Sequence, residues 1–120
     1  MTDLKALAER VSAGIDAYEI PARHPQQLGS VLPPEWFSKH LGNMRKGLVE
    51  PYWADVEGYD RVSGEPRPHK LVIVVDDRNG VYLAFDPQPD EDDFAMVGTE
   101  NGQLKLYNIR GDAVDCYLSF

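Results

Sequence analysis

The sequence predicts an α+β fold in which two N-terminal helices pack on a mainly antiparallel, meander-like sheet of about five strands. Apolar residues recur at helical spacing near the N-terminus, whereas alternating strand patterns and turn signals fill the second half of the chain. The connections after residue 68 are too short to hold crossover helices, so neighbouring strands should be antiparallel. Because 120 residues suit one core, we expect a single domain over residues 1–120, helical over 1–47 and sheet over 48–120.

The first helix is predicted from the N-terminus to Ile20. Thr2 and Asp3 are suitable caps, and Pro21 ends the pattern. Its apolar positions are Leu4, Leu7, Val11 and Ile15. From Pro21 to Val31 the chain has prolines, a glycine and no periodic pattern, which predicts a connecting loop.

The second helix is predicted at about residues 34–46. Pro34 suits a first helical turn, where a missing N–H is harmless, and Glu35 favours the positive end of the helix dipole. Arg45 and Lys46 suit the last turn, and Gly47 is a natural stop. One apolar stripe runs along this helix: Trp36, Phe37, His40, Leu41 and Met44.

The remaining chain reads as strands joined by tight turns. Two Asn-Gly pairs, at Asn79-Gly80 and Asn101-Gly102, are strong hairpin signals because they tolerate positive φ angles. Val81, Leu83 and Phe85 alternate and are expected to face the core. The predicted strands are Lys70 to Asp76, Val81 to Asp86, Phe94 to Thr99, Gln103 to Ile109 and Ala113 to Phe120, and the segment from Val49 to Val56 before them is rich in aromatic residues. The segment from Gly58 to Pro68 is expected to be a connection, because it holds two glycines and two prolines.

Composition restricts the partners and the compartment. The chain has 20 acidic and 12 basic residues, a net charge of −8 and a pI near 4.7. This excess has the wrong sign for non-specific binding to nucleic acid or to an anionic membrane surface. The single cysteine, Cys116, excludes an internal disulfide framework, and no secretory signal or membrane-spanning run is apparent. We therefore expect a cytoplasmic protein.

Acidic residues are concentrated between Asp86 and Asp93. Because this segment carries two prolines, we expect it not to pair as a strand but to form a stiff, exposed anionic loop. Calcium binding of the EF-hand type is excluded, because Glu91 and Val97 stand where the motif needs glycine and glutamate. The loop is then either solvated surface or a site that steers a basic protein partner. The carboxylates concerned are Asp86, Asp90, Glu91, Asp92 and Asp93.

Tyr82 and Tyr107 are expected on the sheet face opposite the core, where exposed tyrosines beside carboxylates would anchor an interface. A register slip of one residue would bury them instead. Among the other candidates, the histidines lack metal-ligand spacing: His40 is expected to pack on its helix, and His24 and His69 to lie in loops. Cys116 should be a core side chain, and no phosphate-binding motif occurs. We expect no metal and no cofactor.

Three short motifs between residues 28 and 90 carry a family resemblance. They are Leu32-Pro33 at the start of the second helix, Gly80-Val81-Tyr82 at a strand start, and Phe85-Asp86-Pro87 before the acidic segment. In these motifs the chain resembles the SUKH superfamily of small α+β proteins, many of which are bacterial immunity proteins. The resemblance implies a protein that neutralises a toxin.

The leading hypothesis is a non-enzymatic acidic protein, an immunity protein that neutralises a basic toxin or effector by occlusion. One alternative is a small-ligand or enzymatic domain with a pocket between the helices and the sheet, where Trp36, His40, Trp53 and Asp86 would be the first residues to suspect. Another is an adaptor or structural subunit with the same acidic surface. The chain could be a monomer, or a homodimer formed through an open sheet edge.

Overall fold

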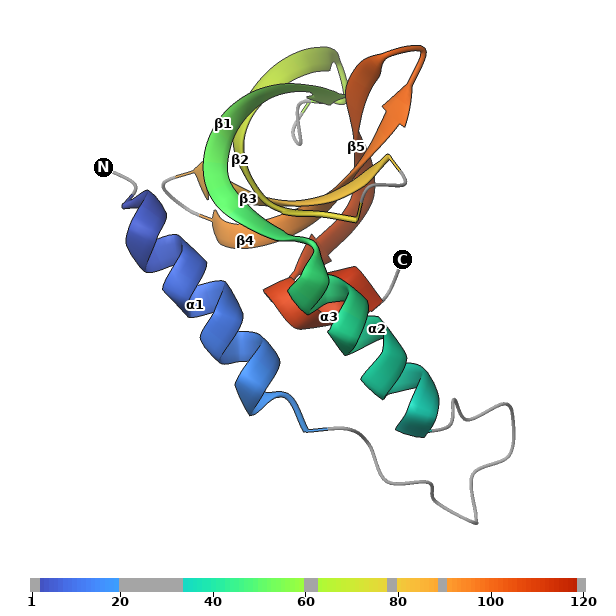
Figure 1. The fold of residues 1–120 in the computed structure, drawn as a ribbon. Helices are drawn as coiled ribbons and strands as arrows, with labels where there is room; N and C mark the ends of the chain where they lie inside the picture. The colour runs from blue at the N-terminus through green and yellow to red at the C-terminus, as the bar shows by residue number, and fades with distance from the viewer. Residues whose placement is uncertain (1–2, 20–33, 60–62, 78–79, 89–90, 119–120) are drawn as a thin grey trace.

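A computed structural model of the chain describes residues 3–19, 34–59, 63–77, 80–88 and 91–118. It confirms the α+β class and the antiparallel meander, and it shows that the five strands close into a small barrel with the helices on one side (Figure 1). The elements are α1 (Leu4–Ala17), α2 (Pro34–Lys46), β1 (Leu48–Tyr59), β2 (Pro66–Asp76), β3 (Val81–Gln88), β4 (Glu91–Glu100), β5 (Gln103–Gly111) and α3 (Ala113–Leu118). None of the described helices is long and apolar enough to span a membrane.

The two N-terminal helices begin and end close to the predicted residues. Asp3 caps α1, because its side-chain Oδ1 accepts hydrogen bonds from the backbone N–H groups of Lys5 and Ala6, at 3.1 and 3.2 Å. Helix α2 ends at Gly47, which is buried against β2: a Cβ there would lie 2.8 Å from the backbone oxygen of Asp76. The backbone N–H of Asp76 also donates to the Gly47 carbonyl at 2.8 Å, so this junction joins α2 directly to the sheet.

The barrel follows from a five-strand antiparallel meander. Because the strand direction reverses four times, β1 and β5 run parallel where the sheet closes. Among the described residues the register joins them at one position, Glu57 opposite Lys105, whereas the other neighbouring strands share longer ladders. The predicted turn between β4 and β5 is confirmed, because Asn101 and Gly102 both have positive φ angles of 53° and 79°.

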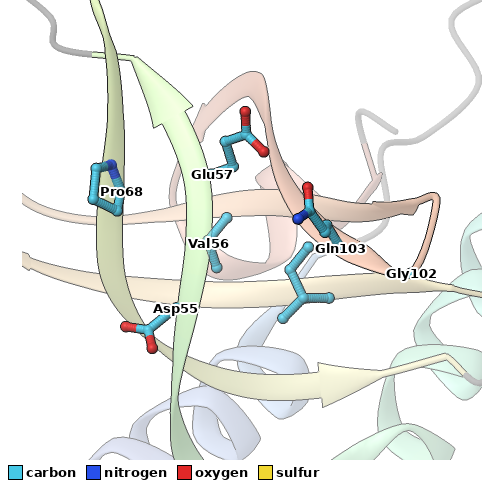
Figure 2. Close-up of a pocket in the computed structure, with 7 residues that line it drawn as sticks. Asp55, Val56, Glu57, Pro68, Gly102 and Gln103 are labelled. Atoms are coloured by element: carbon cyan, nitrogen blue, oxygen red, sulfur yellow. The ribbon is translucent and has the colours of Figure 1, made fainter.

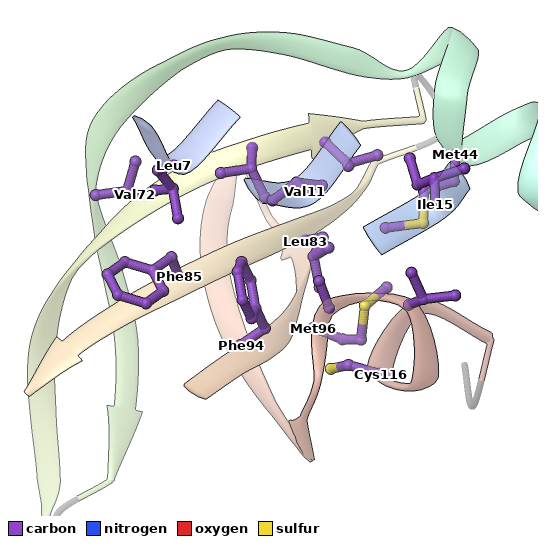
Figure 3. Close-up of a cluster of buried hydrophobic side chains, with 14 residues drawn as sticks. Leu7, Val11, Ile15, Met44, Val72, Leu83, Phe85, Phe94, Met96 and Cys116 are labelled. Atoms are coloured by element: carbon purple, nitrogen blue, oxygen red, sulfur yellow. The ribbon is translucent and has the colours of Figure 1, made fainter. Parts of the chain in front are cut away.

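Two apolar clusters lie on the two faces of the sheet. The larger, called the main core here, fills the space between the helices and the barrel wall and includes α1, β3, β4 and α3 side chains (Figure 3). The predicted core residues Leu83 and Phe85 belong to it, and Val81 packs against it. The smaller, called the barrel core, fills the interior of the barrel and contains Val56, Leu71, Ile73, Ala84 and Val97.

The predicted last strand is wrong, because residues 113–118 form helix α3. Asp112 caps this helix: its Oδ2 accepts from the backbone N–H groups of Val114 and Asp115 at 3.1 and 3.4 Å. Cys116 is buried in the main core as expected. The buried residues of α3 are Ala113, Val114 and Cys116, and the spacing of three between Ala113 and Cys116 is that of a helix face, not of a strand.

The predicted exposed acidic loop is also wrong over most of its length. Strand β3 continues to Gln88 and β4 begins at Glu91, so Asp86 pairs with Asp93 and Pro87 with Asp92. Pro87 is tolerated because the ladder between β2 and β3 stops at Phe85, so at Pro87 the described ladders leave one side of β3 open. Only residues 89–90, which are outside the described residues, separate the two strands.

Candidate functional site

Asp86 was expected to present its carboxylate to a partner, but its side chain is only 1% exposed. The guanidinium of Arg110 on β5 donates from Nη1 to Asp86 Oδ2 at 2.8 Å, and Arg110 itself is 18% exposed. Asp86 of β3 lies opposite Asp93 of β4, and Arg110 of β5 lies opposite Ala95, two residues further along β4, so the guanidinium reaches diagonally across this strand. Asp86 therefore joins β3 to β5 and is not part of an accessible acidic surface.

The second oxygen of Asp86, Oδ1, is buried and has no hydrogen-bond partner among the described residues. Buried carboxylate oxygens are usually satisfied, so this atom could accept a hydrogen bond from a water or a bound donor. The other predicted acids do not bear on this point. Asp90 lies outside the described residues, and the side chains of Glu91, Asp92 and Asp93 are not described, so their role in partner binding stays a prediction.

The two tyrosines proposed as interface anchors lie on different faces. Tyr82 is half-buried and packs against the barrel core, because closure of the sheet turns the face opposite the helices into the barrel interior. The pKa of nearby Tyr52 is raised by burial and, to a smaller extent, by Tyr82 and Asp76. Tyr107 is 39% exposed and rests on Gly98, where a Cβ would lie only 2.0 Å from its hydroxyl oxygen. Of these two tyrosines, Tyr107 is the one exposed enough to serve as a surface anchor.

The alternative pocket between helices and sheet was expected near Trp36, His40 and Trp53. Trp36 and His40 are in contact on α2, with ring centroids 4.2 Å apart. Trp53 lies on β1 across from Val72 and is 43% exposed, and the described part of the chain gives it no ring contact with the other two. The main core occupies the space between the helices and the barrel that this pocket would need, and a pocket formed by these three side chains stays a prediction.

A groove of about 470 Å³ lies instead at the seam of the barrel, where β1 meets the start of β5 (Figure 2). We call it the seam groove. Val56 points from β1 toward the segment that carries Gln103, and Asp55 and Glu57 flank Val56 along the strand. The volume falls in the range of about 300–1,000 Å³ that is usual for ligand sites. Its lining is Asp55, Val56, Glu57, Pro68, Gly102, Gln103 and Leu104.

The acids of the seam groove carry unneutralised charge. Asp55 and Glu57 are exposed, and neither makes an ion pair within 4.0 Å with a described residue. Lys70 and Lys105 lie opposite them in the register, but Lys105 Nζ is directed to Glu100 Oε2 at 3.8 Å. The groove thus combines an apolar floor with two exposed carboxylates that form no ion pair in the described part of the chain, a suitable surface for a ligand with both apolar and basic groups.

His69 borders this region and was wrongly expected to be a loop residue. It is 9% exposed in β2, across from Val56, and its Nε2 donates to the Tyr59 carbonyl at 3.0 Å. Gly58 makes room for it, since a Cβ there would lie 2.7 Å from the imidazole Cδ2. The alternation of His69 with Leu71 and Ile73 was the available signal, and the surrounding prolines obscured it.

The described residues offer no candidate site for a metal ion. Among the described residues, no three histidine, cysteine or carboxylate side chains are grouped so that they could hold a metal ion. Comparison with protein families, with curated proteins and with solved structures finds no match. The groove, the buried ion pair and the charge of the chain are the features that bear on function.

Proposed function

We propose that this protein acts by binding, and that it neutralises a basic protein partner by occluding it. The observation that carries the proposal is the seam groove, where Asp55 and Glu57 present two carboxylates that make no ion pair with a described residue, beside an apolar floor. Interfaces gain affinity from a desolvated apolar centre and gain rate and selectivity from charge around it. The groove offers both within one surface.

The charge of the whole chain supports a basic partner. A net charge of −8 creates a long-range field that attracts cations and accelerates their association, and the effect falls with added salt. Tyr107 and Trp53 add exposed aromatic area elsewhere on the barrel. The resemblance to SUKH immunity proteins favours a secreted toxin as the partner, and the chain would then act as its immunity protein in the cytoplasm.

Co-expression with basic toxin domains from the same organism tests this proposal. We expect one of them to lose its toxicity when the protein is present, and the two purified chains to form a stable complex. If none of the basic toxins is neutralised and none binds, the proposal is wrong, and the adaptor or ligand-binding alternatives gain weight.

Association kinetics then identify the steering charges. Two variants remove acid from different places: Asp55→Asn/Glu57→Gln at the seam groove, and the fourfold replacement of residues 90–93 by Asn and Gln. A matched control, Glu9→Gln/Glu35→Gln, removes two exposed charges from the helices. We expect the groove variant to slow association and flatten its salt dependence more than the control, which removes the same number of charges. Equal effects would refute a role for the groove.

A second candidate function is the binding of a small ligand, favoured by the buried Asp86 Oδ1 that lacks a partner among the described residues. A ligand that donates a hydrogen bond to this atom would raise the melting temperature of the wild type. It would have no such effect on Asp86→Asn. A thermal-shift screen with small amines and amides distinguishes this alternative from protein binding.

A further inference from the structure

We propose that the seam groove takes an extended, basic segment of the partner as an added strand between β1 and β5. This inference rests on the proposed function, because it specifies how the same groove recognises its partner. It also goes further, since it assigns a role to the backbone of the two strands as well as to the carboxylates. The conformation of the bound segment, not only its charge, then decides binding.

Where the barrel closes, the described register joins β1 and β5 at few positions. The ladder between β1 and β2 extends from Val56 back to Tyr52, so one backbone edge of this part of β1 is already used. Gln103 and Leu104 likewise pair with Glu100 and Thr99 of β4. Across the seam, by contrast, the register of the described residues contains one position, Glu57 opposite Lys105. The second edge of each strand faces the groove, and unpaired edges of this kind accept an added strand.

Around Val56 the side chains of β1 alternate between buried and exposed. Val56 is buried toward the barrel interior, whereas its neighbours Asp55 and Glu57 are exposed. An added strand has the same period of two, so its side chains would alternately approach the apolar floor of Val56 and Leu104 and the two carboxylates. The segment that fits has a lysine or arginine at every second position.

The charge of the chain favours a basic segment in the groove over a second copy of the chain. A second copy of this chain would bring another net charge of −8 to the seam, which opposes self-association through this surface. An arginine-rich segment is attracted instead, and a guanidinium can bind a carboxylate through two parallel hydrogen bonds. A basic partner is therefore the occupant, and self-association is an outcome that the experiment can detect.

The experiment uses an octapeptide of alternating arginine and threonine as the probe. We measure its affinity for the wild-type protein and compare it with two peptides: a sequence-scrambled one of equal charge, and one N-methylated at alternate residues. The N-methylated peptide lacks two or three of the backbone hydrogen bonds that an added strand would make. It should therefore bind about tenfold or more weakly than the alternating peptide. Hydrogen exchange should slow in residues 53–56 and 103–105 when the alternating peptide binds. The variant Asp55→Asn/Glu57→Gln should weaken binding, and Glu9→Gln/Glu35→Gln should not.

Each other outcome has a defined meaning. If the three peptides bind equally and only charge matters, strand addition is refuted while the proposed function stands. If the groove variant and the helix control both leave the binding of the peptide and of the protein partner unchanged, the proposed function fails as well. If sedimentation shows a dimer of the free protein that the peptide disrupts, the seam is an interface between copies of this chain and the inference is overturned.

Discussion

The buried ion pair between Asp86 and Arg110 leads to a specific prediction for Arg110→Leu. The substitution leaves the carboxylate of Asp86, 1% exposed, without its described partner. Removing one member of a buried pair costs about 3–5 kcal/mol of folding free energy. We expect about 3 kcal/mol, the lower end, because Arg110 keeps 18% exposure and water can reach the site. With a urea m value of about 2 kcal/mol per molar, the unfolding midpoint should fall by about 1.5 M.

A double-mutant cycle tests whether Asp86 and Arg110 stabilise the fold as a pair. Asp86→Leu/Arg110→Leu removes both charges together, so it should be more stable than Arg110→Leu alone, with a coupling free energy of about 1–3 kcal/mol. Arg45→Leu is the matched control, because the ion pair between Arg45 and Asp16 is largely exposed and should contribute under about 1 kcal/mol. If Arg110→Leu costs no more than Arg45→Leu, or if the single effects add without coupling, Asp86 is not a buried charge held by Arg110.

Three further predictions concern backbone contacts, helix capping and pH. Gly47→Ala should cost about 1–3 kcal/mol in urea unfolding, because its Cβ would lie 2.8 Å from a β2 backbone oxygen. A Cβ at Gly42 meets nothing within 4 Å, so Gly42→Ala should stabilise α2 by about 0.5–1 kcal/mol. Equal effects of Gly47→Ala and Gly42→Ala on stability would contradict the close packing of Gly47 against β2. Asp112→Ala should cost about 0.5–2 kcal/mol through loss of the α3 cap, and Asp112→Asn should recover most of it. Burial, and secondarily Asp77, raises the pKa of Tyr117 above 10.0, so the native state holds this proton more tightly than the unfolded chain. Stability should therefore fall as the pH rises through and above 10.0, less steeply in Tyr117→Phe, and equal slopes would refute the shift.

Local patterns predicted the helices well because their physical causes are local. Leu7, Val11 and Ile15 are buried on one face of α1, as their spacing requires, and α2 ends at Gly47 as predicted. The error at residues 113–118 has a local cause too. The alternation of Val114, Cys116 and Leu118 fits a strand, whereas Ala113 and Cys116 have helical spacing, and the cap at Asp112 decides between the two.

The candidate site was harder to predict because it depends on contacts between distant residues. Asp86 and Arg110 are 24 residues apart, and nothing near Asp86 in the sequence indicates that a guanidinium will cover it. The seam groove likewise requires β1 and β5 to meet, and a meander pattern does not say whether the sheet stays open or closes. Closure of the barrel also determines which of the two tyrosines is accessible, because it places Tyr82 against the barrel core and leaves Tyr107 on the outer surface.

The most direct test of the account is a chemical-shift titration of the ¹⁵N-labelled protein with the alternating arginine-threonine peptide. If the seam groove is the binding surface, the largest shifts will be at Asp55, Val56, Gln103 and Leu104, and they will diminish in Asp55→Asn/Glu57→Gln. Shifts confined to residues 90–93, or to Trp36 and His40 on α2, would contradict the account. They would place the binding surface on residues 90–93 or on the helices.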